Sequence, residues 1–516
     1  MNFAKDKLFF ALNKFKKIDI FSFFIFYLAF IVIARIIEQL FGKSSYDWDI
    51  DHMMYFSGRL LKGELSFVRE FDDKLPLLQY LFLIPAYFQN VKIWTFFSIF
   101  ISCFTSYKIF FFTRYLAIND WEIKDIQFIK KASLFSALFF LFFISSLIGS
   151  FSHINGAAVS FSTLSLIFYT HIFQTNLSQK AKLANLIKSS FFSALAISIR
   201  PYLAPAIILV IVWNHIRNNN LINPNNSYFK DNINLLLIKR LFIFSFFLVF
   251  FGLTLNITPY LLTGNIQSFL NGIYLNSQAL YPSNKILIIK DQLELLLIDI
   301  GNIESFIYLP YFIVFVLLTF QFLSQETNKL SKLIKTDLFF ISILSPLSIL
   351  LIIINKHFWP HYIQFYSGYS ALSIFFLTII FNKFYSPIFN FKLKKPINFC
   401  LVIVLIVFIG RFEFTKAIYK FGVIGRDHIM QTKYELVNKF VEQRDSSDKK
   451  SDFLYPQGIY VHWKLNESRY GFPHSAHFSR IEKGYWNQIK LGVKDKEDYS
   501  PVGFCKMLRD DAPTLI

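Results

Sequence analysis

The sequence predicts an all-α, polytopic membrane protein, and three observations carry this prediction. Hydrophobic residues make up 54% of the 516 residues and charged residues only 17%, with a mean hydropathy of +0.43. Apolar runs long enough to span a bilayer recur along the chain, so we expect about eleven transmembrane helices. Basic connections alternate with the other connections between these runs, which is the pattern of a multi-pass membrane protein.

The apolar segments follow one another over most of the chain. Their approximate limits are 18–37, 92–116, 131–149, 156–174, 189–200, 202–216, 240–262, 304–323, 337–355, 362–382 and 397–411. The segments 189–200 and 202–216 are each short for a full crossing. We therefore expect a hairpin that is broken at Arg200-Pro201, where proline lacks the backbone N–H of a continuing helix.

The basic connections predict the orientation in the membrane. They are 1–17, 118–131, 175–188, 217–240, 324–336 and 383–396. Because basic loops stay on the cytoplasmic side, the N-terminus is expected in the cytoplasm of a plasma or inner membrane protein. The long loop 38–91 and the tail then lie outside. Residues 1–411 would form the transmembrane domain, and 412–516 a small extracytoplasmic C-terminal region.

Composition excludes several other classes of protein. The net charge of +19 does not predict nucleic-acid binding, because the basic residues are spread over short loops between apolar runs. The three cysteines, Cys103, Cys400 and Cys505, lie far apart and have neither disulfide-framework nor zinc-ribbon spacing. The basic N-terminus precedes a span-length run without a small-residue cleavage site, so we expect an uncleaved first helix.

The stretch DWDIDHMMYFSGRLLKG at 47–63 places Asp47, Asp49 and Asp51 directly after an apolar run, and Lys74 follows in the same predicted loop. A carboxylate in a partly desolvated site can act as a general base, and a lysine can hold a phosphate. The alternative is an interfacial loop whose charges pair with one another. Spacing alone does not decide between a catalytic and a structural role.

The order of residues in this loop resembles the first outer loop of C-type (GT-C) glycosyltransferases, closest to the protein O-mannosyltransferases and the bacterial lipid A aminoarabinose transferases. The residues that carry the resemblance are Asp51, His52, Tyr55, Gly58, Arg59, Gly63, Lys74, Leu75 and Pro76. His52 stands where the family usually has Glu, and Leu75 replaces its first Pro. Further resembling stretches follow in order: SIRPYLAP at 198–205, LNITPYLLTG at 255–264, KHFWPHYIQFYSGYSALS at 356–373 and NESRYGFP at 466–473.

The resemblance implies a GT-C-like bundle that transfers a monosaccharide, with inversion, from a polyprenyl-phosphate donor at the lipid bilayer. The acceptor would be a glycolipid, a polysaccharide or a protein on the extracytoplasmic face. Asp51 matches the family's catalytic aspartate, and Lys74 matches its phosphate-contacting lysine. Asp73 stands where the family often carries an acidic residue near a metal. No cofactor is assigned, and a divalent metal ion is compatible with the pattern.

Asp49 is the rival of Asp51 for the general base. Two residues at i and i+2 do not share a helical face, so only one of the two carboxylates is expected to face the site. We favour Asp51, since Tyr55 and Arg59 then follow at i+4 and i+8 on one face. Arg59 and Arg200 are candidates for binding the donor phosphate. The alternative for Arg200 is an interfacial anchor whose charge reaches the bilayer surface.

The remaining candidates are expected to bind donor or acceptor. They are His52, Tyr55, Asp73, His361, Tyr362 and Gln364. An aromatic belt at the membrane interface explains Tyr362 equally well. In the turn SFSHING, which contains His153 and Asn155, the histidine is expected to be solvent-exposed or hydrogen-bonded, and His474 and His477 are expected on the surface.

Two other functions are compatible with a multi-pass chain. A lipid-linked polysaccharide polymerase or ligase would rely on arginines in late outer loops, which are sparse before Arg411. A lipid-linked sugar flippase or transporter would have charges inside its spans and related halves. Polar residues that converge at an outer mouth favour the transferase, whereas convergence at the midplane of the membrane favours transport.

Overall fold

The computed structural model describes residues 48–68, 74–121, 123–144, 154–174, 177–221, 229–280 and 367–380. Within these ranges the chain is helical and contains no β-strand, which confirms the all-α prediction there. The predicted segments 18–37, 304–323, 337–355 and 397–411 and the C-terminal region lie outside the described residues.

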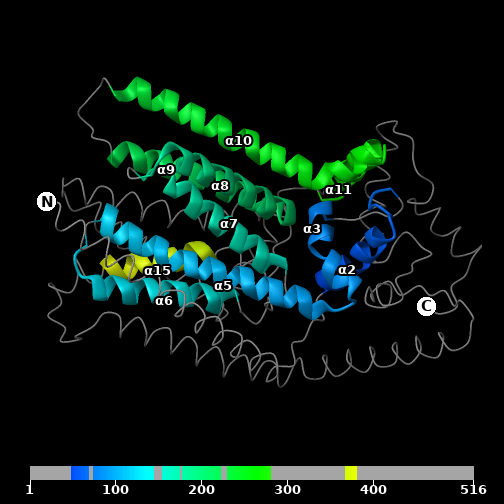
Figure 1. Cartoon of the computed structure of the whole chain (residues 1–516), viewed down its shortest axis with the longest axis horizontal. Helices are drawn as coiled ribbons and strands as arrows, with labels where there is room; N and C mark the ends of the chain where they lie inside the picture. Colours follow the sequence, from blue (N-terminus) through cyan, green and yellow to red (C-terminus); the bar gives the residue numbers. More distant parts are fainter. Residues whose placement is uncertain are drawn as a thin grey trace, which may run out of the picture.

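Long helices that run along one axis form the body of the described part (Figure 1). They are α5 (Val91–Tyr115), α6 (Ile126–Ile144), α7 (Ile154–His171), α8 (Gln179–Ile199), α9 (Ala204–Leu221) and α15 (Ser367–Ile380). Helix α7 is central, because it packs against α5, α8, α9 and α15, while α6 packs against both α5 and α15. Helix α10 (Phe229–Leu262) lies across α8 on the outside of this bundle.

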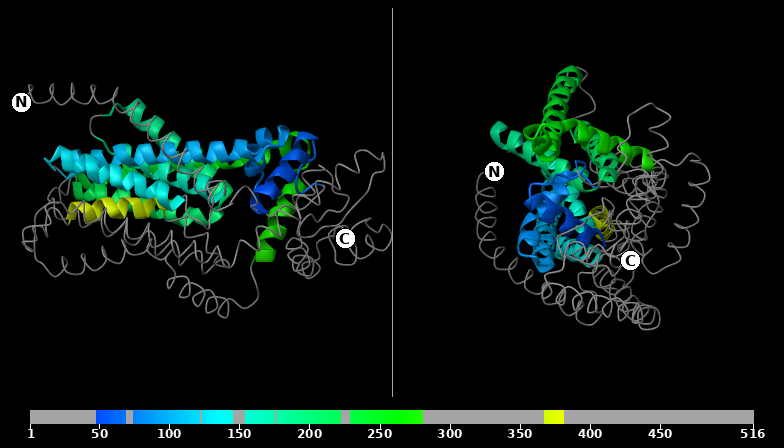
Figure 2. Two further views of the ribbon diagram at one scale, coloured as in Figure 1. Left: turned by 90° about the horizontal axis from the view of Figure 1, so that it is seen from below. Right: turned by 90° about the vertical axis from the view of Figure 1, so that its right-hand side faces the viewer.

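Shorter helices gather at one end of the bundle, as two further views confirm (Figure 2). They are α2 (Trp48–Leu61), α3 (Pro76–Leu81), α4 (Leu83–Tyr87) and α11 (Ile266–Leu280). Helix α2 packs against α3 and α4, and α3 also contacts α8 and α10. The predicted loop 38–91 therefore supplies three helices that sit on the end of the bundle.

Two described helical stretches are long and apolar enough to cross a membrane: Ile93–Asp120 and Ile238–Leu262. The first combines α5 with the π-helical turn η1 (Leu116–Asp120). The second belongs to α10 and leaves Phe242 70% and Phe246 56% exposed. An apolar face of this length suits a lipid environment better than water.

The predicted break at Arg200-Pro201 is confirmed, but the helices on either side of it are longer than the apolar segments in the sequence suggested. Helix α8 ends at Ile199, the 3₁₀ turn η2 covers Pro201–Leu203, and α9 then begins. Helix α8 begins at Gln179, ten residues before the predicted start at 189, and Ser178 caps it by accepting a hydrogen bond from the N–H of Ala181 at 3.2 Å. The expectation that the first half is short was wrong, because the polar turns after Ser178 continue the helix. At about 1.5 Å per residue, the 21 residues of α8 span about 32 Å.

Small polar residues join the helices of the bundle. The Ser165 hydroxyl on α7 lies 2.6 Å from that of Ser193 on α8, and Ser136 on α6 donates to the carbonyl of Ala371 on α15 at 2.7 Å. Small residues let backbones approach closely, as is typical of helix packing in membranes. At Gly368 the approach is so close that an added Cβ would collide with the side chain of Thr163.

The substitution Gly368→Ala is expected to destabilise the protein by about 1–3 kcal/mol, because the new methyl group forces α15 away from α7. Thermal unfolding in detergent measures this loss. Gly252→Ala on α10 is the matched control, since nothing lies within 4 Å of a Cβ added at Gly252. Equal unfolding temperatures for the two variants would contradict the close packing of α15 on α7.

Candidate functional site

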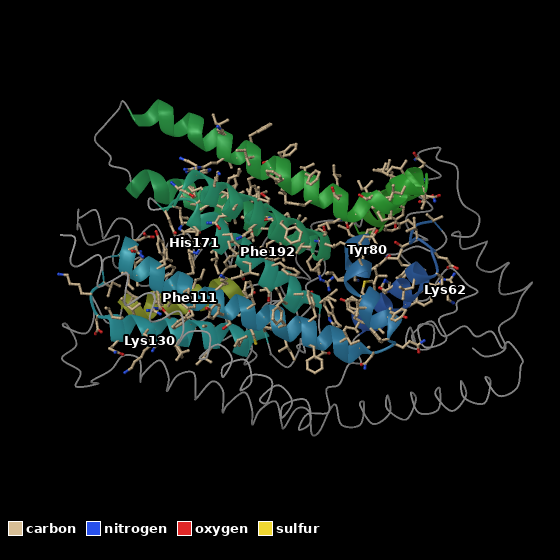
Figure 3. The ribbon with its side chains drawn as sticks, viewed as in Figure 1. Lys62, Tyr80, Phe111, Lys130, His171 and Phe192 are labelled. Atoms are coloured by element: carbon tan, nitrogen blue, oxygen red, sulfur yellow. The ribbon has the colours of Figure 1, made fainter. Side chains whose placement is uncertain are left out.

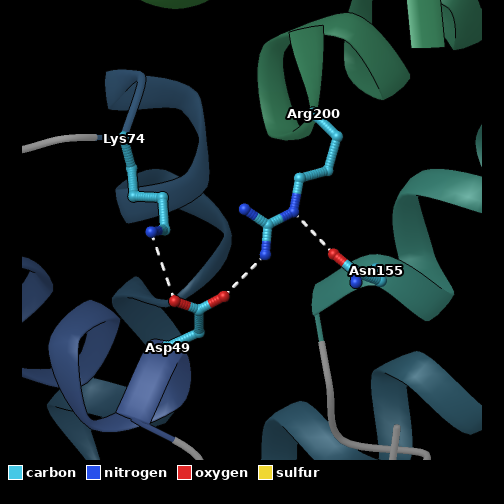
Figure 4. Close-up of polar contacts among 4 residues, drawn as sticks. All are labelled: Asp49, Lys74, Asn155 and Arg200. Atoms are coloured by element: carbon cyan, nitrogen blue, oxygen red, sulfur yellow. Dashed lines mark hydrogen bonds and ion pairs between the residues drawn. The ribbon is translucent and has the colours of Figure 1, made fainter. Parts of the chain in front are cut away.

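Asp49 lies at the centre of a polar cluster at the end of the bundle (Figure 4). It stands in the first turn of α2, where the helix dipole favours a negative charge. Its Oδ1 lies 3.2 Å from Lys74 Nζ, and its Oδ2 lies 2.6 Å from Arg200 Nη2. One carboxylate thus contacts two cations that come from the loop before α3 and from the end of α8.

Arg200 reaches this cluster because the chain leaves the helical conformation at this residue. Its φ and ψ are −140° and 94°, which is the extended conformation that a following proline favours. Its N–H still bonds to the carbonyl of Ala196 at 2.8 Å, which closes the last turn of α8. The side chain then points to the start of α7, where Nε donates to Asn155 Oδ1 at 2.5 Å. With only 7% of its side chain exposed, Arg200 links α2, α7 and α8.

The position of Lys74 depends on how α3 is anchored. Asn256 on α10 accepts a hydrogen bond from the N–H of Leu77 at 3.0 Å, and its amide donates to Ser198 Oγ on α8 at 2.9 Å. Ser57 on α2 donates to the carbonyl of Gln79 at 2.8 Å. The first turn of α3 has no intrahelical acceptor for Leu77, so Asn256 satisfies a donor that would otherwise be buried and unpaired.

Asn256→Leu is expected to cost about 1–3 kcal/mol of stability, because it leaves the N–H of Leu77 without its acceptor in a buried position. The measurement is thermal or denaturant unfolding of the purified protein. Asn119→Leu is the matched control: its amide donates to the carbonyl four residues earlier, as that of Asn256 does, but at an exposed site. A loss as large in the control would contradict the anchoring role of Asn256.

A second contact fixes the turn that follows α2. Tyr260 on α10 donates from its hydroxyl to the carbonyl of Ser66 at 2.8 Å, and its ring packs with Phe67 and Phe269. Phe67 has a φ of 63°, a conformation that non-glycine residues adopt only where surrounding contacts enforce it. The same turn carries Glu64, which forms an ion pair with Arg59.

The structure places the predicted residues of α2 in different surroundings. Arg59 pairs with Glu64, so it is not in the cluster around Asp49 that Figure 4 draws. His52 and Tyr55 are buried, and the rings of both contact Phe56, at 4.8 and 5.2 Å between centroids. A direct role of His52, Tyr55 and Arg59 in binding stays a prediction.

Several predicted residues lie outside the described part of the chain. Asp51 belongs to the backbone of α2, but its side chain is outside that part, as are Asp73, His361, Tyr362 and Gln364. His153, His474 and His477 are outside it as well. Asp49, Lys74 and Arg200 are the predicted residues that the structure brings together.

Sequence analysis assigned no site role to Asn155, Asn256 or Ser198. Asn155 is fully buried at the start of α7 and orients the guanidinium of Arg200. A polar amide at the end of an apolar segment was the available signal for Asn155, and a lone amide within an apolar segment was the signal for Asn256. Neither signal identifies the partner residue.

Tyr80 lies next to the anchored turn of α3. Burial raises the pKa of Tyr80 to about 12, so its phenol is neutral at physiological pH. Its hydroxyl has no hydrogen-bond partner within the described ranges, so it is a donor without a protein acceptor there.

The cluster has the chemistry of an anion site. Two cations, Lys74 and Arg200, meet there at one carboxylate, that of Asp49. A guanidinium held by an amide and an ammonium just before α3 are suited to the oxygens of a phosphate. Over the described residues, no group of three or more His, Cys, Asp or Glu side chains could hold a metal ion.

The comparisons with known proteins leave the family open. No protein-family model matches the chain, and searches of curated proteins and of solved structures find no similar protein. The functional argument therefore depends on the residues themselves.

Proposed function

We propose that this protein is an integral membrane glycosyltransferase that moves a monosaccharide from a polyprenyl-phosphate donor to an acceptor on the extracytoplasmic face. The observation that carries the proposal is the meeting of Asp49, Lys74 and Arg200 at one end of the bundle. These residues come from two of the stretches in which the sequence resembles C-type glycosyltransferases, the first outer loop and SIRPYLAP at 198–205. A cationic site beside carboxylates at a helix end suits a lipid phosphate that enters from the bilayer.

In the proposed reaction Asp51 is the general base. Its carboxylate takes the proton of the acceptor hydroxyl while the acceptor oxygen forms a bond to the anomeric carbon of the sugar. The bond from that carbon to the phosphate oxygen breaks, and its electron pair leaves with the lipid phosphate. A single displacement inverts the anomeric configuration and passes through a state with oxocarbenium character.

Lys74 and Arg200 neutralise the charge that develops on the leaving phosphate. Asp49 is a positioning residue, because its two oxygens hold the ammonium and the guanidinium from opposite sides (Figure 4). When the donor phosphate enters, it competes with Asp49 for these cations. The acceptor is a glycolipid, a polysaccharide or a protein.

The proposal includes the predicted topology of about eleven transmembrane helices, with a cytoplasmic N-terminus and an extracytoplasmic C-terminal region. The loop 38–91 then faces the outside. The apolar stretches Ile93–Asp120 and Ile238–Leu262 support a membrane location. A transporter is the second candidate, and the position of the cluster at a helix end supports the transferase over it.

A test uses the purified full chain in lipid vesicles with a panel of radiolabelled polyprenyl-phosphate sugars. We expect loss of label from one donor, and Asp51→Asn provides the inactive control. Labelled lipid that only changes leaflet would identify a flippase and overturn the transferase. Products of many repeated units would identify a polymerase.

A further inference from the structure

A second polar cluster lies towards the end of the bundle away from Asp49, beside the last turn of α7, the second half of α9 and the first half of α10. Helix α7 starts beside Arg200 and its 18 residues span about 27 Å, so its last turn is far from the site described above. Figure 3 shows His171, the last residue of α7, towards this end, and Lys62 and Tyr80 towards the other.

Three hydrogen-bond donors surround one aromatic ring in this cluster. The guanidinium carbon of Arg240 lies 5.1 Å from the centre of the Phe173 ring. The ring of Tyr169 lies 6.0 Å and that of His215 lies 6.3 Å from the same ring, between centroids. The donors come from α10, α7 and α9, so only the tertiary structure brings them together.

The helices that carry these groups are held in place beside the cluster. Ser190 on α8 donates to the carbonyl of Phe244 on α10 at 3.1 Å, one turn beyond Arg240. The ring of Phe244 meets that of Tyr169 edge-on, with 5.4 Å between centroids. Arg240 is therefore directed towards α7, while Lys239 beside it is exposed.

None of the three groups has an acceptor in the part of the chain that the structure describes. Tyr169 is only 1% exposed, and its buried hydroxyl has no hydrogen-bond partner there. The same holds for the buried Nε2 of His215. No carboxylate of the described residues forms an ion pair with Arg240. Buried donors and a half-buried cation are costly without a partner, so an anion at this point would be stabilised.

We propose that Arg240, Tyr169 and His215 form a binding site for a phosphate group. A guanidinium binds two phosphate oxygens at once, and the phenol and the imidazole of His215, in the tautomer that is protonated at Nε2, supply further donors to the same group. A purely structural role, in which Arg240 stacks on Phe173, accounts for the cation but leaves the two buried donors unsatisfied. The phosphate satisfies all three.

The site is independent of the proposed transferase activity. Arg240 lies two residues after the start of the apolar stretch Ile238–Leu262, which is where a phospholipid headgroup meets a spanning helix. A phospholipid and a soluble phosphate compound share the chemistry that these donors recognise. The experiment therefore includes both sources.

The test uses the purified full chain in detergent. Native mass spectrometry follows titration with phosphatidylglycerol and with diacylglycerol of the same acyl chains, and calorimetry follows inorganic phosphate. We expect wild type to retain phosphatidylglycerol but not diacylglycerol. Arg240→Gln should lower the affinity for the lipid at least about tenfold, as expected for the loss of a charge-assisted hydrogen bond. Tyr169→Phe should lower it about threefold, as expected for the loss of a neutral hydrogen bond.

Lys239→Gln is the matched control, because it removes the same charge from the neighbouring exposed position. We expect it to change the affinity less than about twofold, as for a screened surface charge. Binding of inorganic phosphate that depends on Arg240, without such lipid binding, would support the site with a soluble ligand. An equal loss in Lys239→Gln and Arg240→Gln would overturn the proposal. The proposal would also be overturned if Tyr169→Phe, which keeps the packing of the ring, bound both phosphatidylglycerol and phosphate as tightly as wild type.

Discussion

Replacing Asp51 by asparagine is expected to lower sugar transfer roughly 10²–10⁴-fold, the contribution of a positioned general base. Asparagine keeps the shape of the side chain but cannot take the proton of the acceptor hydroxyl. The loss should appear in kcat, with the donor KM changed little, because the cations that bind the phosphate remain. Single-turnover release of labelled sugar from the donor measures the effect.

Asp49→Asn is the matched variant, two residues earlier on the same helix. The amide still accepts a hydrogen bond but no longer carries the charge that Lys74 and Arg200 contact. We expect the rate to change by less than about tenfold, mainly through the donor KM, as for the loss of one charge-assisted contact. If Asp49→Asn abolishes transfer while Asp51→Asn retains it, Asp49 is the base.

Replacing Arg200 by glutamine is expected to reduce the free energy of unfolding by about 1.5–3 kcal/mol, because a largely buried charge-assisted hydrogen bond is lost while Lys74 still compensates Asp49. The side chain is 7% exposed and that of Asp49 24%, so solvent screens this pair only in part. The variant also removes the Nε–H that donates a hydrogen bond to Asn155 Oδ1. Thermal unfolding gives the stability, and titration with the polyprenyl-phosphate donor should show at least about tenfold weaker binding.

Two controls separate charge from geometry. Arg200→Lys keeps the charge, but one ammonium cannot present the planar fork that contacts Asp49 and Asn155 together, so we expect only partial recovery. Lys180→Gln removes a positive charge from an exposed position on α8 and should change stability by less than about 0.5 kcal/mol. Full recovery in Arg200→Lys, or an equal loss in Lys180→Gln, would show that net charge alone matters.

The helices could be predicted largely because helical structure depends on local pattern. Apolar runs predicted α5, α6, α7 and α10, and a proline predicted the break after α8. The boundaries were less accurate where polar residues continue a helix. Helix α10 begins at Phe229, well before the apolar run at 240, and α8 begins at Gln179. Hydrophobicity reports burial or contact with lipid, whereas a helix needs only backbone hydrogen bonds and tolerates polar turns.

The candidate site was predicted in composition but not in arrangement. Sequence analysis named Asp49, Lys74 and Arg200 separately, and it grouped Arg59 with the two phosphate-binding candidates. The structure shows an ion pair between Arg59 and Glu64, five residues along the chain, and a role of Arg59 in binding phosphate stays a prediction. A guanidinium reaches only nearby carboxylates, and the turn after α2 places Glu64 beside it.

By itself the sequence determined that this chain forms apolar helices, where the chain breaks at Pro201, and which charged side chains follow the first apolar run. The tertiary structure alone decided that Asp49 meets Arg200, 151 residues away, that Asn155 and Asn256 hold the site together, and that Arg240, Tyr169 and His215 all lie beside the ring of Phe173. The physical reason is that hydrophobic periodicity and proline act within a few residues of the chain. The partner of a buried charge is set by how the helices pack, which depends on the fit of whole surfaces.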